Sequence, residues 1–373
     1  MKLPDAPSLT ELQRHIPSIA PLPEGTRRPF WSVMIPTYNS GDYLKRALTS
    51  VLSQDAGPDQ MQIEVVDGCS TKDDPEAVVR ELGGNRVAFH RLSSNQGGPH
   101  TFNTCIRRSR GHWVHILHGD DMVLPGFYSA YRALIESHPA VMMVVGKVVT
   151  IDEADRWLYL SPGGPVPPHA IIEDFVPRQA VEQQAAVPTV VVRRTAYERA
   201  GGFCTWFTHV ADMDMWFRVG LTGPVARVPA AYALFRKHAA SDTNLHTASA
   251  SNVREIFVSN LVNLARLHAA APGTDVDGGW RRRLAAYGEE WAWRLDGAGE
   301  LRGRFNQARF AWGLDPTPRR FMFMAKSWLK MMLKQNERDP GPAPVDGASS
   351  IDDSGIGASN RSLNGGVLEG TES

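Results

Sequence analysis

Short apolar runs alternate with segments of helical periodicity through the first half of the chain, and this alternation restricts the fold more than any other feature. Most of the runs are soon followed by Pro, Gly, Asn or Asp, as strands commonly are. Between the runs, apolar residues such as Leu44, Leu48 and Val51 recur at helical spacing. The predicted strands cover residues 31–36, 62–66, 87–92, 113–117, 141–149, 188–193 and 232–238. Short apolar strands that alternate with helices predict an α/β protein whose mostly parallel sheet is covered by helices on both faces.

Changes in composition divide the chain into four predicted parts. They are an irregular N-terminal arm over 1–29, an α/β domain over 30–245, a helical region over 246–336 and a disordered tail over 337–373. Within the arm, one helical turn is expected around residues 9–15. Between residues 152 and 187 the alternating pattern breaks into Pro, Gly and mixed residues. We interpret this segment as a long excursion over the site, because structureless loops of such length are often functional.

Charge and cysteine content exclude several classes of protein. Lys plus Arg and Asp plus Glu both number 40, so the net charge is zero and gives no reason to expect a nucleic-acid partner. The cysteines Cys69, Cys105 and Cys204 are odd in number and widely spaced, which fits a reducing compartment better than a disulfide framework or a zinc site. No signal peptide or bilayer-spanning stretch is predicted. We therefore expect a cytoplasmic protein.

Two adjacent carboxylates follow the predicted strand 113–117. The strand leads through Gly119, where the backbone can turn sharply, into Asp120 and Asp121. Ligands of open α/β sheets bind at the carboxyl ends of strands. Acidic side chains without Lys or Arg beside them suit a hard divalent cation, which in turn suits a bound phosphate. The alternative for this pair is a solvated Asp-Asp turn before a helix.

Glycine motifs that bind phosphate on other α/β folds are absent from the sequence. No Gly-x-Gly-x-x-Gly follows the first strand, and no Gly-x-x-x-x-Gly-Lys-Ser/Thr occurs. Both motifs use glycines to bring phosphate onto a helix N-terminus. Their absence counts against a dinucleotide-binding fold and against a P-loop.

A series of motifs between residues 31 and 238 resembles the family-2 glycosyltransferases with the GT-A fold, in the order that the family has them. The motifs are 33–39 (Val-Met-Ile-Pro-Thr-Tyr-Asn), 65–71 (Val-Val-Asp-Gly-Cys-Ser-Thr), 95–98 (Asn-Gln-Gly-Gly), 117–121 (Leu-His-Gly-Asp-Asp), 211–212 (Ala-Asp) and 235–238 (Phe-Arg-Lys-His). The resemblance implies a Rossmann-like GT-A catalytic domain followed by the helical region.

Three positions depart from the family pattern. His118 stands where the family often has the first Asp of its DxD metal motif. Gly68 replaces the second acid of an Asp-Asp pair, and Ala211 replaces the Glu before the catalytic base. The resemblance therefore leaves Asp120 as the metal ligand of its motif and makes His118 a wall of the nucleotide or sugar pocket.

The resemblance also implies roles for individual residues. Asp212 would be the catalytic base, Asp120 and His238 would bind a divalent metal (Mn²⁺ or Mg²⁺), and Arg236 would contact the diphosphate. The implied nucleotide-binding residues are Pro36, Thr37, Tyr38, Asn39, Asp67, Asn95, Gly97, His118 and Gly119.

Three of these roles have structural alternatives. Asp67 at the end of a strand would either accept a hydrogen bond from a uracil-type base or cap the turn at Ser70. His238 taken alone would be an ordinary surface histidine. Asp212 would also serve as the N-cap of the helix that follows it.

The expected reaction is the inverting, metal-dependent transfer of a sugar from a nucleotide-sugar, UDP-sugar by resemblance, to a hydroxyl of a glycan or lipid-linked acceptor. A non-catalytic nucleotide-sugar-binding protein is the first alternative, because acids are lost at positions 68, 118 and 211. A nucleotidyltransferase is the second, although it should carry a Gly-rich loop with Arg or Lys after the first strand.

Residues 318–334 form an amphipathic pattern near the end of the helical region. On a helical wheel Lys326, Lys330 and Lys334 share one face. The residues predicted opposite them are Phe321, Met324, Ala325, Trp328 and Met332. This helix would either lie on an anionic membrane surface, as peripheral contact with the inner face of the cell membrane, or pack on the catalytic domain by the same apolar face.

Overall fold

The structure is a computed structural model that describes residues 6–161, 170–238, 250–274 and 278–338, together with residues 241, 246 and 276. The chain divides into one compact unit over Met1–Met331 and a second over Met332–Ser373. The contacts described below lie within the first unit. Apart from residues 337 and 338, the tail predicted over 337–373 lies outside the described residues.

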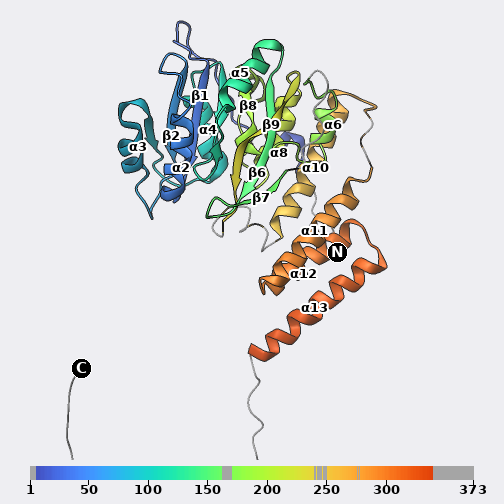
Figure 1. Ribbon diagram of the computed structural model, residues 1–373. Helices are drawn as coiled ribbons and strands as arrows, with labels where there is room; N and C mark the ends of the chain where they lie inside the picture. Colours follow the sequence, from blue (N-terminus) through green and yellow to red (C-terminus); the bar gives the residue numbers. More distant parts are fainter. Residues whose placement is uncertain are drawn as a thin grey trace, which may run out of the picture. The chain divides into compact units, whose positions relative to one another are not determined.

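The first four strands form a parallel half-sheet in the order β3-β2-β1-β4 (Figure 1). The strands are β1 (Trp31–Thr37), β2 (Met61–Asp67), β3 (Ala88–Arg91) and β4 (Trp113–Ile116). Helices α2 (Gly41–Leu52), α3 (Pro75–Gly83) and α4 (Gly98–Arg108) connect them. In the register of β1 and β2, Thr37 lies beside Asp67, so the strands present their carboxyl ends at one edge of the sheet.

The second half of the sheet is mixed and continues the order as β4-β8-β6-β9-β5, with β7 paired to β6. Its strands are β5 (Met122–Val123), β6 (Met143–Ile151), β7 (Trp157–Leu160), β8 (Val191–Arg193) and β9 (Val225–Arg236), and its helices are α5 (Phe127–Ser137), α6 (Phe175–Gln179), α7 (Arg194–Ala200) and α8 (Ala211–Gly220). Strands β6 and β9 are parallel, whereas β8 runs antiparallel to β4 and β6. The predicted α/β class is confirmed. The excursion 152–187 proves to contain β7 and α6.

Both faces of the sheet are covered by apolar side chains. Val33 and Ile35 of β1 belong to one core cluster, together with Leu44 and Leu48 of α2. Met34 belongs to the other cluster, which contains Cys105 and Ile106 of α4. Neighbouring residues of a strand point to opposite faces, so these two clusters are the two sides of one sheet. Helices on both faces were predicted and are confirmed.

The N-terminal arm is packed on the domain. Its helix α1 (Leu9–Gln13) buries Leu12, so the predicted helical turn is confirmed. The backbone N–H of Thr205 donates to the carbonyl of His15 at 2.9 Å, and that of Gly202 donates to Pro17 at 2.7 Å. These bonds attach the arm to the segment that leads into α8.

The helices described after the sheet are α10 (Ser251–Ala270), α11 (Trp280–Gly297), α12 (Leu301–Leu314) and α13 (Pro318–Arg338). Helix α11 ends at Gly297, and the helical region predicted over 246–336 did not reveal the boundary between α11 and α12. Gly299 between them has φ +78°, a conformation that glycine adopts without strain. In the described part of the chain, no helix is long and apolar enough to cross a membrane.

Candidate active site

The first loops of the site lie at the carboxyl ends of β1, β2 and β4. The N–H of Gly68 donates to the carbonyl of Thr37 at 2.8 Å, and the N–H of Gly119 donates to Pro36 at 2.9 Å. A Cβ on Gly119 would lie 2.9 Å from the hydroxyl of Thr37. Position 119 therefore has to remain glycine for the loop after β4 to pass so close to β1. Pro36, Thr37 and Gly119 meet at one edge, as the motifs predicted.

Asn39 organises the loop that follows β2. It adopts a positive φ of 52°, its N–H donates to the hydroxyl of Ser70 at 2.8 Å, and its side-chain oxygen accepts the N–H groups of Thr71 and Lys72 at 2.9 and 3.0 Å. Tyr38 beside it is exposed. Of these two predicted nucleotide-binding residues, only Tyr38 presents its whole side chain to a ligand.

Asp67 has the turn-capping role that was the alternative to base binding. Its carboxylate is fully buried and accepts hydrogen bonds from the N–H and hydroxyl of Ser70 and from Arg91, the last at 2.7 Å. Both oxygens are therefore occupied inside the protein. These contacts bury the carboxylate, and a hydrogen bond that Asp67 accepts from a base stays a prediction.

Asn95 and Gly97 form the turn that opens α4. The side-chain oxygen of Asn95 accepts the N–H of Gly97 at 2.8 Å, and Gly97 has φ +88°. Both residues are exposed. They remain candidates for the nucleotide site at this side of the sheet.

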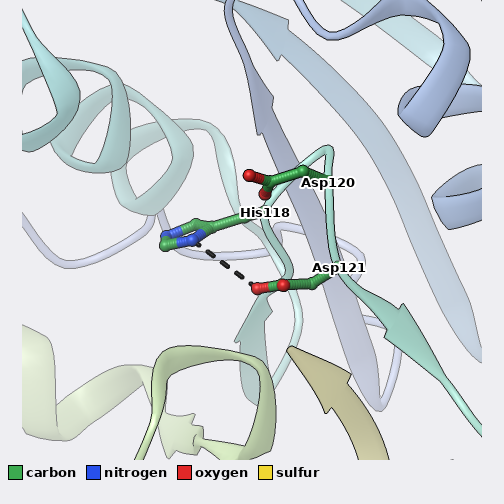
Figure 2. Close-up of side chains that lie close together, drawn as sticks. All are labelled: His118, Asp120 and Asp121. Atoms are coloured by element: carbon green, nitrogen blue, oxygen red, sulfur yellow. Dashed lines mark ion pairs between the residues drawn. The ribbon is translucent and has the colours of Figure 1, made fainter. Parts of the chain in front are cut away.

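His118, Asp120 and Asp121 converge directly after β4 (Figure 2). Each offers one ligand atom, and these atoms lie within 4.8 Å of one another. The imidazole Nδ1 of His118 is 3.7 Å from Asp121 Oδ2, and its ring stacks on Phe102 at 5.1 Å. Figure 2 shows both carboxylates directed toward the imidazole. Two carboxylates and one imidazole form a donor set for Mn²⁺ or Mg²⁺.

Asp121 lacks a partner for one of its oxygens. The residue is fully buried, its Oδ1 accepts the N–H of Arg236 at 2.9 Å, and its Oδ2 has no hydrogen-bond partner among the residues that the structure describes. Burial and the neighbouring Asp120 raise the pKa of the Asp121 carboxyl well above its usual range. A divalent cation would supply the missing partner, so these residues fit a metal.

His238 pairs with the other carboxylate. Its Nε2 lies 3.0 Å from Asp120 Oδ2, and its ring lies 5.0 Å from Tyr43. Burial raises the pKa of Asp120. The hydrogen bond to His238 and the nearby imidazoles lower it by more, so the net pKa is below its ordinary value. The sequence motifs gave metal binding to Asp120 and His238. The structure groups Asp120 with His118 and Asp121 and also places His238 against Asp120, so metal binding by His238 stays a prediction. The adjacency of Asp121 to Asp120 was the signal for Asp121.

Arg236 is bonded to the loops that surround Asp120. Its buried guanidinium donates to the carbonyls of Asp120 and Asp152, each at 2.9 Å, and pairs with Asp155 at 2.6 Å. These bonds occupy much of the guanidinium, and its contact with a diphosphate stays a prediction. Arg236 is a positioning residue for the loop that carries Asp120.

Asp212 is the second residue of α8, and the N-cap is Val210. The predicted N-cap role of Asp212 is therefore wrong by two positions. Its carboxylate accepts the side-chain amide of Gln183 at 2.7 Å and the N–H of Met213 at 2.9 Å. Burial raises the pKa of Asp212, while His209 and then His118 partly oppose that rise. Asp212 is therefore close enough to His118 for their charges to interact, and a raised pKa suits a general base.

Glu255 of α10 fixes the loop that precedes Asp212. Its carboxylate accepts the backbone N–H groups of Thr208, His209 and Val210 at 3.1, 2.8 and 3.3 Å. Neither Glu255 nor Gln183 was found from the sequence, because each lies far along the chain from the residue that it positions.

Comparison with known proteins identifies the family. Residues 32–198 match Glycosyl transferase family 2. The uncharacterized protein MT1568 of Mycobacterium tuberculosis is 30% identical over 243 residues, which cover 61% of this chain and 73% of that protein. The poly(ribitol-phosphate) beta-N-acetylglucosaminyltransferase TarS of Staphylococcus aureus is 28% identical over 116 residues, 31% of this chain and 20% of TarS.

Among solved structures, S. aureus TarS 1-349 in complex with UDP aligns with a TM-score of 0.46 at 15% identity, over 85% of this chain and 94% of that one. The sequence matches, taken with the motifs at the strand ends, show that the chain belongs to glycosyl transferase family 2 and is a glycosyltransferase.

Proposed function

We propose that the protein transfers a sugar from a nucleoside-diphosphate sugar, a UDP-sugar, to a hydroxyl of a glycan or of a lipid-linked acceptor, with inversion at the anomeric carbon. The observation that carries this proposal is the cluster of His118, Asp120 and Asp121 within 4.8 Å. It lies near Asp212, whose pKa is raised by burial. Such a pairing of a metal-binding cluster with a separate carboxylate suits activation of a leaving diphosphate and of an incoming hydroxyl.

His118, Asp120 and Asp121 would hold a divalent metal, and their convergence supports this assignment. When bound, the metal would neutralise the charge that develops on the departing diphosphate. An imidazole among the ligands favours Mn²⁺ over Mg²⁺. His238, hydrogen-bonded to Asp120, would keep that carboxylate in one orientation.

Asp212 would take the proton of the acceptor hydroxyl as its oxygen bonds to the anomeric carbon. The bond from that carbon to the diphosphate breaks at the same time, and the diphosphate leaves with the electron pair. Gln183 donates to Oδ2 of Asp212 at 2.7 Å and would orient the carboxylate. Burial, which raises the pKa of Asp212, makes it a stronger base than an exposed aspartate.

The nucleotide would lie against the exposed loops at the ends of β1 and β4 and at the start of α4. Tyr38, Asn95 and Gly97 are exposed there, and Gly119 lets the two loops approach each other. The name of TarS, which describes transfer of N-acetylglucosamine to poly(ribitol-phosphate), supports a polymeric acceptor.

The test is release of nucleoside diphosphate from UDP- and GDP-sugars by the full chain, with Mn²⁺ and with a chelator. We expect UDP release that requires Mn²⁺ or Mg²⁺. Binding of UDP without turnover for any sugar would contradict transfer, and release that a chelator leaves unchanged would contradict the metal.

We further propose that α13 makes peripheral contact with the cytoplasmic face of the membrane. Its Phe321, Met322, Trp328 and Leu329 are exposed. The helix also contacts the rest of the unit: Ser327 is fully buried and hydrogen-bonded to Arg304, Phe321 packs on Trp312 with ring centroids 5.7 Å apart, and Lys330 pairs with Asp296 at 2.6 Å. Packing of the apolar face on the catalytic domain therefore stays the alternative. Residues 318–334 contain Lys and Arg but no Asp or Glu, which suits anionic lipid.

Sedimentation with vesicles tests this contact. Binding to vesicles with 30% phosphatidylglycerol should exceed binding to pure phosphatidylcholine, each basic residue near the surface contributing about 1 kcal/mol. Trp328→Ser should weaken it, whereas Leu82→Ser, at an exposed position of α3, serves as the control. Equal sedimentation of the wild type and Trp328→Ser would contradict the contact.

A further inference from the structure

Strand β7 exposes four consecutive large side chains at the side of the sheet. Trp157, Leu158, Tyr159 and Leu160 are 69%, 51%, 47% and 53% exposed. In the part of the chain that the structure describes, β7 pairs with β6 alone. Contiguous exposed apolar groups of this kind mark binding surfaces more often than chance.

One of these rings belongs to a group of aromatic and cationic side chains drawn from three segments. The amine of Lys237, just after β9, lies 5.0 Å from the ring centroid of Tyr159 and 5.9 Å from that of Trp291 in α11. The guanidinium of Arg294 lies 4.9 Å from Trp291. We call Tyr159, Lys237, Trp291 and Arg294 the aromatic platform. Within the described residues, Arg294 is ion-paired with Glu290 and no carboxylate is paired with Lys237.

The platform begins beside the candidate active site. Lys237 directly follows Arg236, which donates to the carbonyl of Asp120, and directly precedes His238, which pairs with the carboxylate of Asp120. The N–H of Lys237 donates to the carbonyl of Ile151 at 2.9 Å, which fixes the backbone at this point. The platform is therefore joined through the backbone to the two residues that contact Asp120.

We propose that the aromatic platform binds the acceptor, and that the acceptor is an acidic glycan, a sugar chain that carries phosphate or carboxylate groups. This inference rests on the proposed function and specifies its acceptor. Aromatic rings pack against the C–H faces of sugar rings, since both surfaces are flat and apolar. Lys237 and Arg294 attract anionic groups on the same chain. The donor does not need this surface, because its residues lie at the ends of β1, β2 and β4.

The experiment is an array of neutral, carboxylate-bearing and phosphate-bearing oligosaccharides, probed with the full chain and followed by calorimetry on the strongest binder. The variants are Tyr159→Ala, Lys237→Gln and Trp291→Ala. Trp293→Ala is the matched control, because Trp293 lies on the same helix, is 60% exposed and packs on Phe323 outside the platform. UDP affinity with Mn²⁺ is measured on every protein, and oligomeric state by light scattering.

We expect the acidic glycans to bind, and each platform variant to weaken that binding by about tenfold or more, equivalent to 1.4 kcal/mol. Binding should also weaken as salt is raised, since exposed charges are screened. The UDP affinity of every variant should equal that of the wild type. The glycan affinity of the Trp293→Ala variant should also equal that of the wild type. If the wild type binds acidic glycans at the platform but does not bind UDP, the proposed function is contradicted. The platform proposal then still holds.

Several results would overturn the platform itself. These are an array on which no acidic glycan binds, equal binding of neutral and acidic glycans, and wild-type affinity in all three variants. A platform variant that converts a dimer into a monomer would make this surface an interface between copies of the chain, and that result also overturns it.

Discussion

Two buried carboxylates have opposite surroundings, Asp214 in α8 and Asp121 after β4. Both are fully buried. Asp214 is ion-paired with Arg218 at 2.7 Å and with Arg266. Burial raises the pKa of Asp214, but the two arginines lower it by more, so the net pKa is below the ordinary value. Asp121 accepts one backbone N–H, lies 3.7 Å from the imidazole of His118 and has the like charge of Asp120 beside it, and its pKa is raised.

The difference separates a structural carboxylate from a ligand-binding one. Charge on Asp214 is balanced inside the protein, so it needs nothing from solvent. A buried carboxylate without a cation is costly, because it has lost its hydration shell. Asp121 therefore has to be protonated or paired with a cation from outside. That requirement, rather than the acidity of the sequence alone, supports a metal at this edge.

The largest effect should come from Asp212→Asn. A positioned carboxylate base contributes about 10² to 10⁴ in rate, and we expect turnover to fall by that factor. Asn keeps one oxygen for the N–H of Met213 and gives up the acceptor of the Gln183 amide, which is a small loss, so the fold and UDP affinity should be retained. Initial rates of UDP release in the presence of acceptor measure it. A folded variant with wild-type turnover would show that the base lies elsewhere.

Replacing each of the two contrasted carboxylates should change stability with opposite sign. Asp214→Asn leaves Arg218 and Arg266 buried without their partner, so the free energy of unfolding should fall by about 3–5 kcal/mol. Asp121→Asn keeps the acceptor for the N–H of Arg236 and removes a like charge beside Asp120, so stability in a chelator should not fall. Urea unfolding of both variants measures this. Similar losses in the two would show that the surroundings do not distinguish them.

The parallel half of the sheet could be predicted from the sequence more fully than the second half. Strands β1, β2 and β4 are mainly apolar runs bounded by turn residues, so pattern alone located them within a residue or two. Strand β5 has two residues and β7 is exposed on its whole length, so neither produces a periodic signal. The division of α11 from α12 depends on Gly299, where a single turn interrupts a continuous helical composition.

Within the site, motifs located the residues but not their partners. The sequence placed Asp67 and Arg236 at the correct edge, yet their bonds to Arg91 and to the loop carbonyls depend on tertiary contacts. Gln183 and Glu255 reach the region of Asp212 from segments 29 and more than 40 residues away in the chain. No local pattern encodes such contacts.

Asp120→Asn tests the cation at the unbalanced edge. A neutral amide is a poorer ligand for a hard dication than a carboxylate, so UDP affinity in Mn²⁺ should fall by about 10²-fold, toward its value in a chelator. Asp42→Asn, which changes an exposed acid in the first turn of α2, is the control. Calorimetric titration of UDP measures both. Unchanged affinity in Asp120→Asn would count decisively against metal binding by this residue.

The smallest effect concerns His115, a buried titratable group that is neutral rather than charged. It lies in β4 with its ring nitrogens 3.2 Å from the hydroxyl of Tyr128 and 3.1 Å from the carbonyl of Pro188, and burial lowers its pKa from 6.5 to about 4. Below pH 6.5 the unfolded chain binds a proton that the folded protein excludes, so stability falls as pH decreases toward 4. From pH 7.5 to 5.5 this single group should cost about 1.4 kcal/mol.

Urea unfolding of the wild type and of His115→Gln at these two pH values isolates the contribution, because Gln does not titrate. The wild type should lose more stability than the variant by about that amount. The carboxylates flanking the same strand are common to both proteins, so their titration cancels in the difference. Equal losses would mean that His115 is protonated in the folded state, and then β4 would carry a buried positive charge beside the edge that we interpret as short of cations.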